Sequence, residues 1–171
     1  LSNQRIIKEF KGPRGEGQII SGKKYGPEIL LGSMNGNIYK STVMASGETE
    51  TLNLITENIY AKIYDIDEKE DELYFLTKDH IFKVDYKDGK VNEEVSTNGE
   101  NSFICANGGF ILYSQETRNP VRFISGLGED TVLFTPKSSL QTLRAFGNKL
   151  VEIESSSTVN VFDFETKKLK E

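Results

Sequence analysis

The sequence predicts an all-β protein built from four similar units, each of four antiparallel strands. Four short apolar runs start about 44, 37 and 40 residues apart, at Ile29–Leu31, Leu73–Leu76, Phe110–Tyr113 and Leu150–Ile153. Each run is followed by a polar turn and then by a segment in which apolar and polar residues alternate. The Asn35-Gly36 turn after the first run is a strong hairpin signal, because both turn residues take φ > 0. No segment shows the sustained apolar stripe of a helix.

A repeat of roughly 40–45 residues is typical of the four-stranded blades of β-propellers. The sequence therefore predicts a single β-propeller domain over residues 1–171, with about four four-stranded antiparallel blades. The four units are expected at approximately 17–55, 59–96, 101–135 and 140–171.

Within each unit the strands are expected in a fixed order. The innermost strands are expected at Gln18–Ser21, Ile59–Ile66, Ser102–Ala106 and Leu140–Phe146, and the apolar runs form the second strands. The third strands are expected at Asn37–Lys40, His80–Asp85 and Pro120–Ile124, and within 158–168. The outer strands are expected at Thr51–Ile55, Lys90–Val95, Thr131–Phe134 and, as a bare start, Lys168–Lys170. The period-2 alternation in these segments is the pattern of strands that bury one face.

The segment 158–168, which reads T-V-N-V-F-D-F-E-T-K-K, resembles the third strand of a WD40 repeat. That family usually reads T-V-x-V-W-D-L-x-T-G-K, so Phe162 stands where the tryptophan is expected. The resemblance covers the fourth unit well, the second moderately, and the first and third poorly. The Gly-His pair that precedes the inner strand in that family is absent. The resemblance implies a divergent propeller that acts as a non-enzymatic scaffold in a multiprotein complex.

The ends of the chain raise the question of how the ring is closed. Residues 4–10 form an apolar-rich strand without a unit of its own, and we expect it to close the ring or to pair with a neighbouring blade. Two arrangements are open: a closed ring of four blades, or a partial, open ring that belongs to a larger propeller. The start at Leu1 and the WD40-like segment favour the partial ring, and the chain is then expected to be a piece of a longer protein.

The composition and net charge of the chain bear on which partners and which cellular location are expected. The net charge of −5 makes a general affinity for nucleic acid unfavourable, because such binding depends on clustered Lys and Arg. No apolar run approaches the roughly 20 residues that span a bilayer, so no membrane partner is expected. Cys105 is the single cysteine, so no intrachain disulfide can form, and we expect an intracellular location, in cytoplasm or nucleus.

Three patterns that could carry chemistry are explained more simply by structure. The segment Gly17–Lys24 nearly matches a phosphate-binding loop, but Lys24 replaces the hydroxyl residue and the segment is expected to be a strand. The acidic run 65–72 lacks the glycine and the spacing of a calcium loop, so we interpret it as a solvated hairpin. His80 has no second histidine or nearby cysteine for a zinc site. No catalytic residue, cofactor or metal is therefore predicted.

The predicted function is protein–protein interaction through loops. Candidate contact residues, chosen from their expected positions in loops, are Asn35, Lys69, Asp79 and Arg118. The partners are expected to be proteins, and they could supply missing blades or complete an open edge.

Two alternatives remain open. A hydrolase or lyase propeller would need charges at the ring axis, where Lys62, Asp65 and Arg144 are expected. A small-molecule or sugar-binding propeller could use Tyr60, Tyr64 and Tyr113 for stacking.

Overall fold

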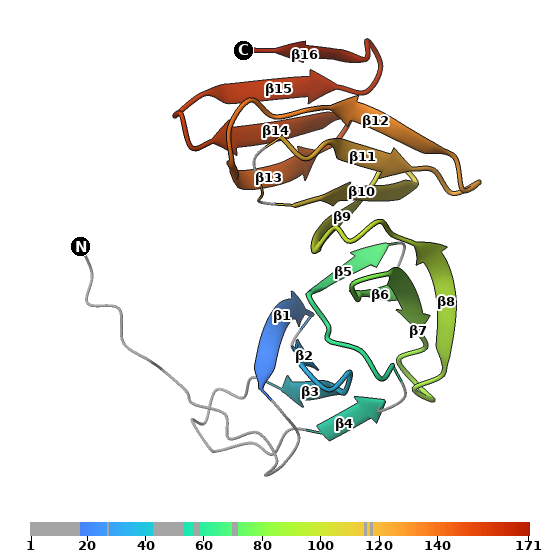
Figure 1. The fold of residues 1–171 in the computed structure, drawn as a ribbon. Coiled ribbons are helices and arrows are strands. Elements are labelled where there is room, and N and C mark those ends of the chain that lie inside the picture. Colours follow the sequence, from blue (N-terminus) through green and yellow to red (C-terminus); the bar gives the residue numbers. More distant parts are fainter. Residues whose placement is uncertain are drawn as a thin grey trace.

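The computed structural model of the protein describes residues 18–26, 28–42, 53–56, 59–69, 72–114, 116 and 118–171. Across these residues sixteen strands form four separate four-stranded antiparallel sheets, and no helix occurs (Figure 1). Each sheet keeps its strands in sequence order. The predicted fold class, an all-β propeller of four four-stranded blades, is confirmed. The predicted strand at 4–10 lies outside the described residues.

Each blade runs from an inner to an outer strand. Blade 1 contains β1 (Ile19–Tyr25), β2 (Glu28–Ser33), β3 (Ile38–Thr42) and β4 (Asn53–Thr56). Blade 2 contains β5 (Asp65–Lys69), β6 (Glu72–Leu76), β7 (His80–Val84) and β8 (Val91–Ser96). Blade 3 contains β9 (Ser102–Ala106), β10 (Gly109–Tyr113), β11 (Val121–Ile124) and β12 (Asp130–Phe134). Blade 4 contains β13 (Leu140–Phe146), β14 (Lys149–Glu154), β15 (Val159–Asp163) and β16 (Lys168–Lys170).

One strand prediction is substantially wrong. The inner strand of blade 2 was expected at Ile59–Ile66, but β5 begins only at Asp65. Tyr60 has φ of +54°, which interrupts an extended strand at the start of this segment. The segment 59–64 instead connects blades 1 and 2, and the Ile63 N–H donates to the Ser33 carbonyl at 3.1 Å. Ile59 and Ile63 are nevertheless buried, which explains why the segment resembled a strand.

Alternating side chains of the strands fill three cores between successive blades. In blade 2, Leu73 and Phe75 pack toward blade 1, while Tyr74 and Leu76 pack toward blade 3. In blade 3, Phe110 and Leu112 continue the core shared with blade 2, and Ile111 joins the core shared with blade 4. Four blades with three shared cores form an open row.

The inner strands follow the same open sequence. β1 lies beside β5, β5 beside β9, and β9 beside β13. The described sheets do not close into a ring, which agrees with the predicted partial or open ring.

The inner strands of blades 1, 2 and 3 are joined to one another by side chains of β5. Asp65 accepts the Phe103 N–H at 3.2 Å, and Asp67 accepts the Cys105 N–H at 2.8 Å, so both carboxylates hold β9. Asp67 also forms an ion pair with Lys23 of β1. Burial raises the pKa of Asp65 above its usual value. The interpretation of the acidic run as a solvated hairpin is therefore wrong for Asp65 and Asp67, because their backbone groups belong to a strand and their carboxylates cap the edge of the next blade.

Blades 1 and 2 approach closely at a glycine. The Ser21 hydroxyl donates to the Ile63 carbonyl at 3.0 Å, which ties β1 to the connection before β5. A Cβ on Gly32 would lie 2.5 Å from both the Ile63 Cγ2 and the Ser21 Oγ. Only glycine therefore permits this approach without a shift of the connection.

The WD40-like segment forms β15 and the turn after it. Phe162 is buried in the core between blades 3 and 4, with its ring centroid 5.8 Å from that of Phe134. The Asp163 carboxylate accepts the N–H groups of Glu165 and Thr166, each at 3.0 Å. Asp85 caps the equivalent turn of blade 2 in the same way, accepting the Lys87 N–H at 2.7 Å. The acidic residue that ends the motif thus fixes the turn into the outer strand.

Blade 4 places acidic groups in its core. Glu152 and Glu154 lie on the face of β14 that packs on blade 3, and each side chain is 1% exposed. The Asn160 amide donates to Glu152 Oε1 at 2.6 Å and to Glu154 Oε1 at 3.2 Å. Glu152 Oε2 has no hydrogen-bond partner. Burial, and secondarily the charge of Glu154, raise the pKa of Glu152 above its usual value of 4.5.

Because the Glu152 carboxyl group is buried, we expect its contribution to the free energy of unfolding to fall as pH rises. Above pH 4.5 the unfolded chain releases the Glu152 proton while the folded protein still holds it, so this group's contribution declines as pH rises through the folded pKa. Glu152→Met should remove that decline and raise stability near neutral pH by about 1 kcal/mol, or ~2–4 °C in Tm. Thermal unfolding between mild acid and neutral pH checks this, with the exposed Glu165→Met as control. A stability difference from wild type that does not vary with pH would contradict it.

Candidate partner-binding surfaces

The antiparallel order of the strands assigns every loop to one of two faces. The turns after the first and third strands of each blade lie on one face, which we call the turn face. The turns after the second strands lie on the other, the connection face, together with the segments that join successive blades. This division determines which predicted contact residues can act together.

The four predicted contact residues do not form one surface. Asn35, Asp79 and Arg118 lie on the connection face, in turns of three different blades, and all three are exposed. Lys69 ends β5 and therefore lies at the turn face, where its ammonium is 5.0 Å from the centroid of the Phe110 ring in blade 3. Lys69 thus contacts the neighbouring blade. The binding roles of all four residues remain predictions.

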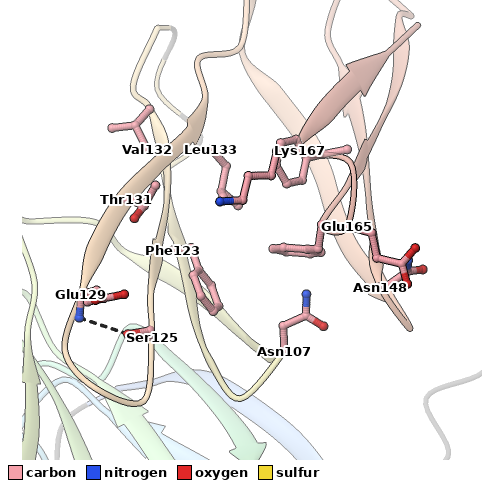
Figure 2. A pocket seen from close by; sticks show the side chains of 12 residues that line it. Asn107, Phe123, Ser125, Glu129, Thr131, Val132, Leu133, Asn148, Glu165 and Lys167 are labelled. Carbon is pink, nitrogen blue, oxygen red and sulfur yellow. Dashed lines mark hydrogen bonds between the residues drawn. The ribbon is translucent and has the colours of Figure 1, made fainter.

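A groove of about 780 Å³ lies between blades 3 and 4 (Figure 2). One wall is formed by β12 and the turn before it, and the other by the β15–β16 turn. The lining residues are Asn107, Phe123, Ser125, Glu129, Thr131, Val132, Leu133, Asn148, Phe162, Phe164, Glu165 and Lys167. The groove opens on the turn face, since Asn107, Asn148 and the third-strand turns all lie there. None of the four predicted contact residues lines it.

The floor of this groove is aromatic. The Phe164 ring meets that of Phe123 at a centroid distance of 5.9 Å and that of Phe162 at 5.3 Å, both in edge-on arrangements. Phe123 comes from blade 3 and the other two rings come from blade 4. An edge-on aromatic cluster is a rigid apolar surface, so the groove can bury an apolar side chain of a ligand.

The rim of the groove is polar and its β12 wall has an open edge. Glu129 stands on the blade 3 side, and Glu165 and Lys167 stand on the blade 4 side. In the described part of the chain β12 pairs only with β11, so the other edge of this strand presents backbone N–H and C=O groups. Such an edge can accept an additional strand. The groove therefore combines an apolar floor, carboxylates on both walls, and a backbone edge.

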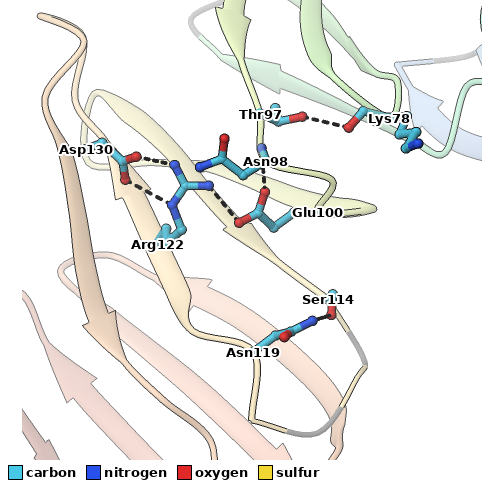
Figure 3. Close-up of polar contacts among 8 residues, drawn as sticks. All are labelled: Lys78, Thr97, Asn98, Glu100, Ser114, Asn119, Arg122 and Asp130. Atoms are coloured by element: carbon cyan, nitrogen blue, oxygen red, sulfur yellow. Dashed lines mark hydrogen bonds and ion pairs between the residues drawn. The ribbon is translucent and has the colours of Figure 1, made fainter.

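A cluster of ion pairs and hydrogen bonds around Arg122 joins β11 to the connection between blades 2 and 3 (Figure 3). Arg122 is buried on β11, where Nη1 donates to Glu100 at 2.7 Å and Nε to Asp130 at 3.1 Å, while Nη2 also pairs with Asp130. Glu100 accepts the Asn98 N–H at 2.9 Å. Thr97 donates its hydroxyl to the Lys78 carbonyl at 3.0 Å. The guanidinium thus links β11 to both β12 and the 97–101 connection.

A second, smaller cavity of about 280 Å³ lies beside the inner strands. Asp65 and Arg144, two of the three charges expected at the axis, line it together with Tyr113, Gln141 and Thr142. Burial, followed by the charge of Asp65, raises the pKa of Tyr113. The third charge, Lys62, instead lies over the Tyr64 ring at 4.5 Å from its centroid, and Tyr60 is exposed. Of the three tyrosines considered for ligand stacking, only Tyr113 lines this cavity.

The remaining chemical candidates contact structural neighbours. His80 begins β7, and its ring centroid is 5.7 Å from that of Phe82. Burial raises the pKa of the Cys105 thiol, which favours its protonated form. Within the described ranges no cluster of three or more His, Cys, Asp or Glu side chains could hold a metal ion, and there is no helix suited to crossing a membrane.

No protein-family profile and no curated protein matches the chain, but solved structures share its fold. The designed Ika4 protein matches with a TM-score of 0.63 and 14% identity, over 94% of this chain and 98% of Ika4. The designed Ika8 protein matches with a TM-score of 0.63 and 15% identity, over 95% of this chain and 50% of Ika8. The Nup159 N-terminal domain matches with a TM-score of 0.60 and 9% identity, over 94% of this chain and 44% of that domain.

Two further matches come from other settings. One is a structure in which S. cerevisiae Dbp5 is bound to Nup159, Gle1, IP6 and ADP, with a TM-score of 0.62, 10% identity, and 94% and 44% coverage. The other is the extracellular domain of BT4673 from B. thetaiotaomicron, described as a one-component system, with a TM-score of 0.59 and 16% identity. The chain covers 23% of that domain and about half of Ika8 and Nup159. At these identities the matches establish the propeller fold.

The Arg122 cluster yields a stability prediction. Arg122→Ala leaves Glu100 buried without its cation, so the free energy of unfolding should fall by about 3 kcal/mol. Arg122→Lys should recover only part of this loss, because one ammonium cannot reproduce the three guanidinium contacts. Urea unfolding checks both variants. Arg118→Ala, at an exposed turn residue, serves as control and should change stability by less than about 0.5 kcal/mol. An unchanged unfolding midpoint for Arg122→Ala would contradict the account.

Proposed function

We propose that this protein is a non-enzymatic interaction module whose groove between blades 3 and 4 binds an extended segment of a partner protein. The groove itself carries the proposal. Its volume of about 780 Å³ lies within the range of ligand sites, roughly 300–1,000 Å³, and its floor is aromatic. The WD40-like character of 158–168 belongs to the same proposal, because Phe162 and Phe164 of that segment supply part of the floor.

The shape of the groove favours an extended peptide. A segment that pairs with the open edge of β12 runs along one wall, and alternate side chains then point toward the floor. An aromatic or aliphatic side chain fits against Phe123 and Phe164. Backbone pairing supplies affinity without sequence preference, while the floor selects the apolar anchor.

The charges at the rim select a basic residue beside that anchor. Glu129 lines the groove from blade 3 and Glu165 lines it from blade 4, and Lys167 is the one cation among the described lining residues. The net charge of the chain, −5, favours the approach of a basic segment as well. The bound segment is therefore expected to carry Lys or Arg next to an apolar anchor.

The similar structures are compatible with this function and with one alternative. The Nup159 complex contains the protein partners Dbp5 and Gle1, which supports a protein-binding role for this fold. The smaller cavity beside the inner strands favours a second candidate function, the binding of a small polar ligand between Asp65, Tyr113 and Arg144. The groove variants described next would not change the binding of such a ligand.

A phage-displayed library of random linear peptides, selected on the wild-type protein, tests the proposal. The selected peptides should share an apolar anchor flanked by Lys or Arg. Glu129→Lys and Glu165→Lys should each raise the Kd of a selected peptide about tenfold, which is ~1.4 kcal/mol. Phe164→Ala should weaken binding as well, provided that circular dichroism shows an intact fold.

Asp79→Lys is the matched control, because it makes the same charge change on the connection face. Its Kd should equal that of wild type. If Asp79→Lys weakens binding while the two groove reversals do not, the connection face is the binding surface and the proposal is wrong.

A further inference from the structure

The two sheet faces at the ends of the blade row differ from the faces inside it. In blades 2 and 3 the second strand contributes alternate residues to the next blade's core: Tyr74 and Leu76 in one, Ile111 and Tyr113 in the other. Val151 and Ile153 hold the equivalent positions in blade 4. No described blade follows them. The outward face of blade 4 thus has the positions of an inter-blade interface without the neighbour.

This outward face is apolar like those that are covered. Val161 lies directly opposite Val151, and Val159 opposite Ile153, so the four side chains share one face of the sheet. Val159 is 49% exposed, and Phe146 at the end of β13 is 64% exposed. Arg144 and Lys149 lie on the same face by the same register. An apolar sheet face of this kind favours burial against another sheet.

The first blade offers a face that fits it. Leu30 packs toward blade 2, so Ile29 and Leu31 point the other way, and Tyr39 lies directly opposite Leu31. In blade 2 the corresponding positions are held by Leu73, Phe75 and Phe82, which form the core toward the preceding blade. Tyr39 is already covered within the chain at 1% exposed, whereas Ile29 and Leu31 are only half-buried and leave apolar surface for a neighbouring sheet. Blade 1 therefore presents the receiving half of the same interface.

We infer that two copies of this chain close a ring head to tail, with the outward face of blade 4 in each copy packed on the outward face of blade 1 in the other. The occupant of the blade 4 face is thus a second copy. Two four-bladed rows make eight blades, within the known range of propeller rings. A two-fold axis relates the copies and closes the assembly without a free end.

Two observations support a second copy in particular. The inferred interface continues the pattern that the chain already uses three times between its own blades. The four-sheet unit also matches nearly all of one solved chain, Ika4, and half of another, Ika8. A four-sheet unit of this kind therefore occurs both as nearly a whole chain and as half of a longer chain. The surface is distinct from the groove, so the inference does not depend on the proposed peptide binding.

The molar mass of the purified chain in solution tests this inference. Light scattering coupled to size exclusion should give twice the 19.2 kDa of the monomer. Val159→Asp on blade 4 and Ile29→Asp on blade 1 should each raise the dimer dissociation constant at least about tenfold, because each buries a carboxylate in both copies of the interface. Leu127→Asp, which makes a comparable change at an exposed turn of blade 3, should leave the dimer intact.

The outcomes separate the possible assemblies. A monomer for the wild-type chain at micromolar concentration overturns the inference, even if a variant fails to fold. If Val159→Asp disrupts the dimer while a folded Ile29→Asp leaves it intact, the dimer joins two blade 4 faces. That outcome overturns the head-to-tail arrangement. Circular dichroism of both variants establishes that loss of the dimer is not loss of fold.

Discussion

Two carboxylates on one short strand hold the row of blades together at its centre. An inner strand pairs with its own blade along one edge only, so the N–H groups on its other edge need acceptors. For β9 these acceptors are Asp65 and Asp67 of β5, which bind the N–H groups of Phe103 and Cys105. Lys23 of β1 binds Asp67 in turn, so three successive blades meet at one side chain. The spacing of blades 1 to 3, and the position of Asp65 in the smaller cavity, depend on these contacts.

Much of the fold follows from local sequence pattern. The inner strands Ser102–Ala106 and Leu140–Phe146 were predicted with the bounds that the structure has, because their alternation and their flanking turns are clear. The segment from Ile59 was misjudged, since its buried isoleucines imitate a strand while Tyr60 takes a left-handed conformation. The acidic run was misjudged for another reason. A carboxylate that caps a strand edge in a neighbouring blade has the same local sequence signature as one in solvent.

The candidate site was harder to predict because it belongs to no single unit. Its floor combines Phe123 of blade 3 with Phe162 and Phe164 of blade 4, and repeat spacing does not show that these rings meet. The face on which Lys69 lies could have been predicted from the sequence, however. Counting strand directions through an antiparallel blade assigns the end of an inner strand to the turn face, opposite the turns that contain Asn35 and Asp79. The same counting gathers the loops around the groove on one face.

Amide hydrogen exchange of Phe103 and Cys105 tests the central role of the β5 carboxylates most directly. In wild type both amides should be protected, although they lie on the edge of β9 that does not pair with β10. Asp67→Ala should speed exchange at Cys105 by about tenfold or more, since a hydrogen bond to a charged group contributes roughly 1.5–3 kcal/mol. Glu68→Ala, at the exposed neighbour on the same strand, should leave both amides unchanged. Equal exchange at Cys105 in wild type and Asp67→Ala would contradict the account.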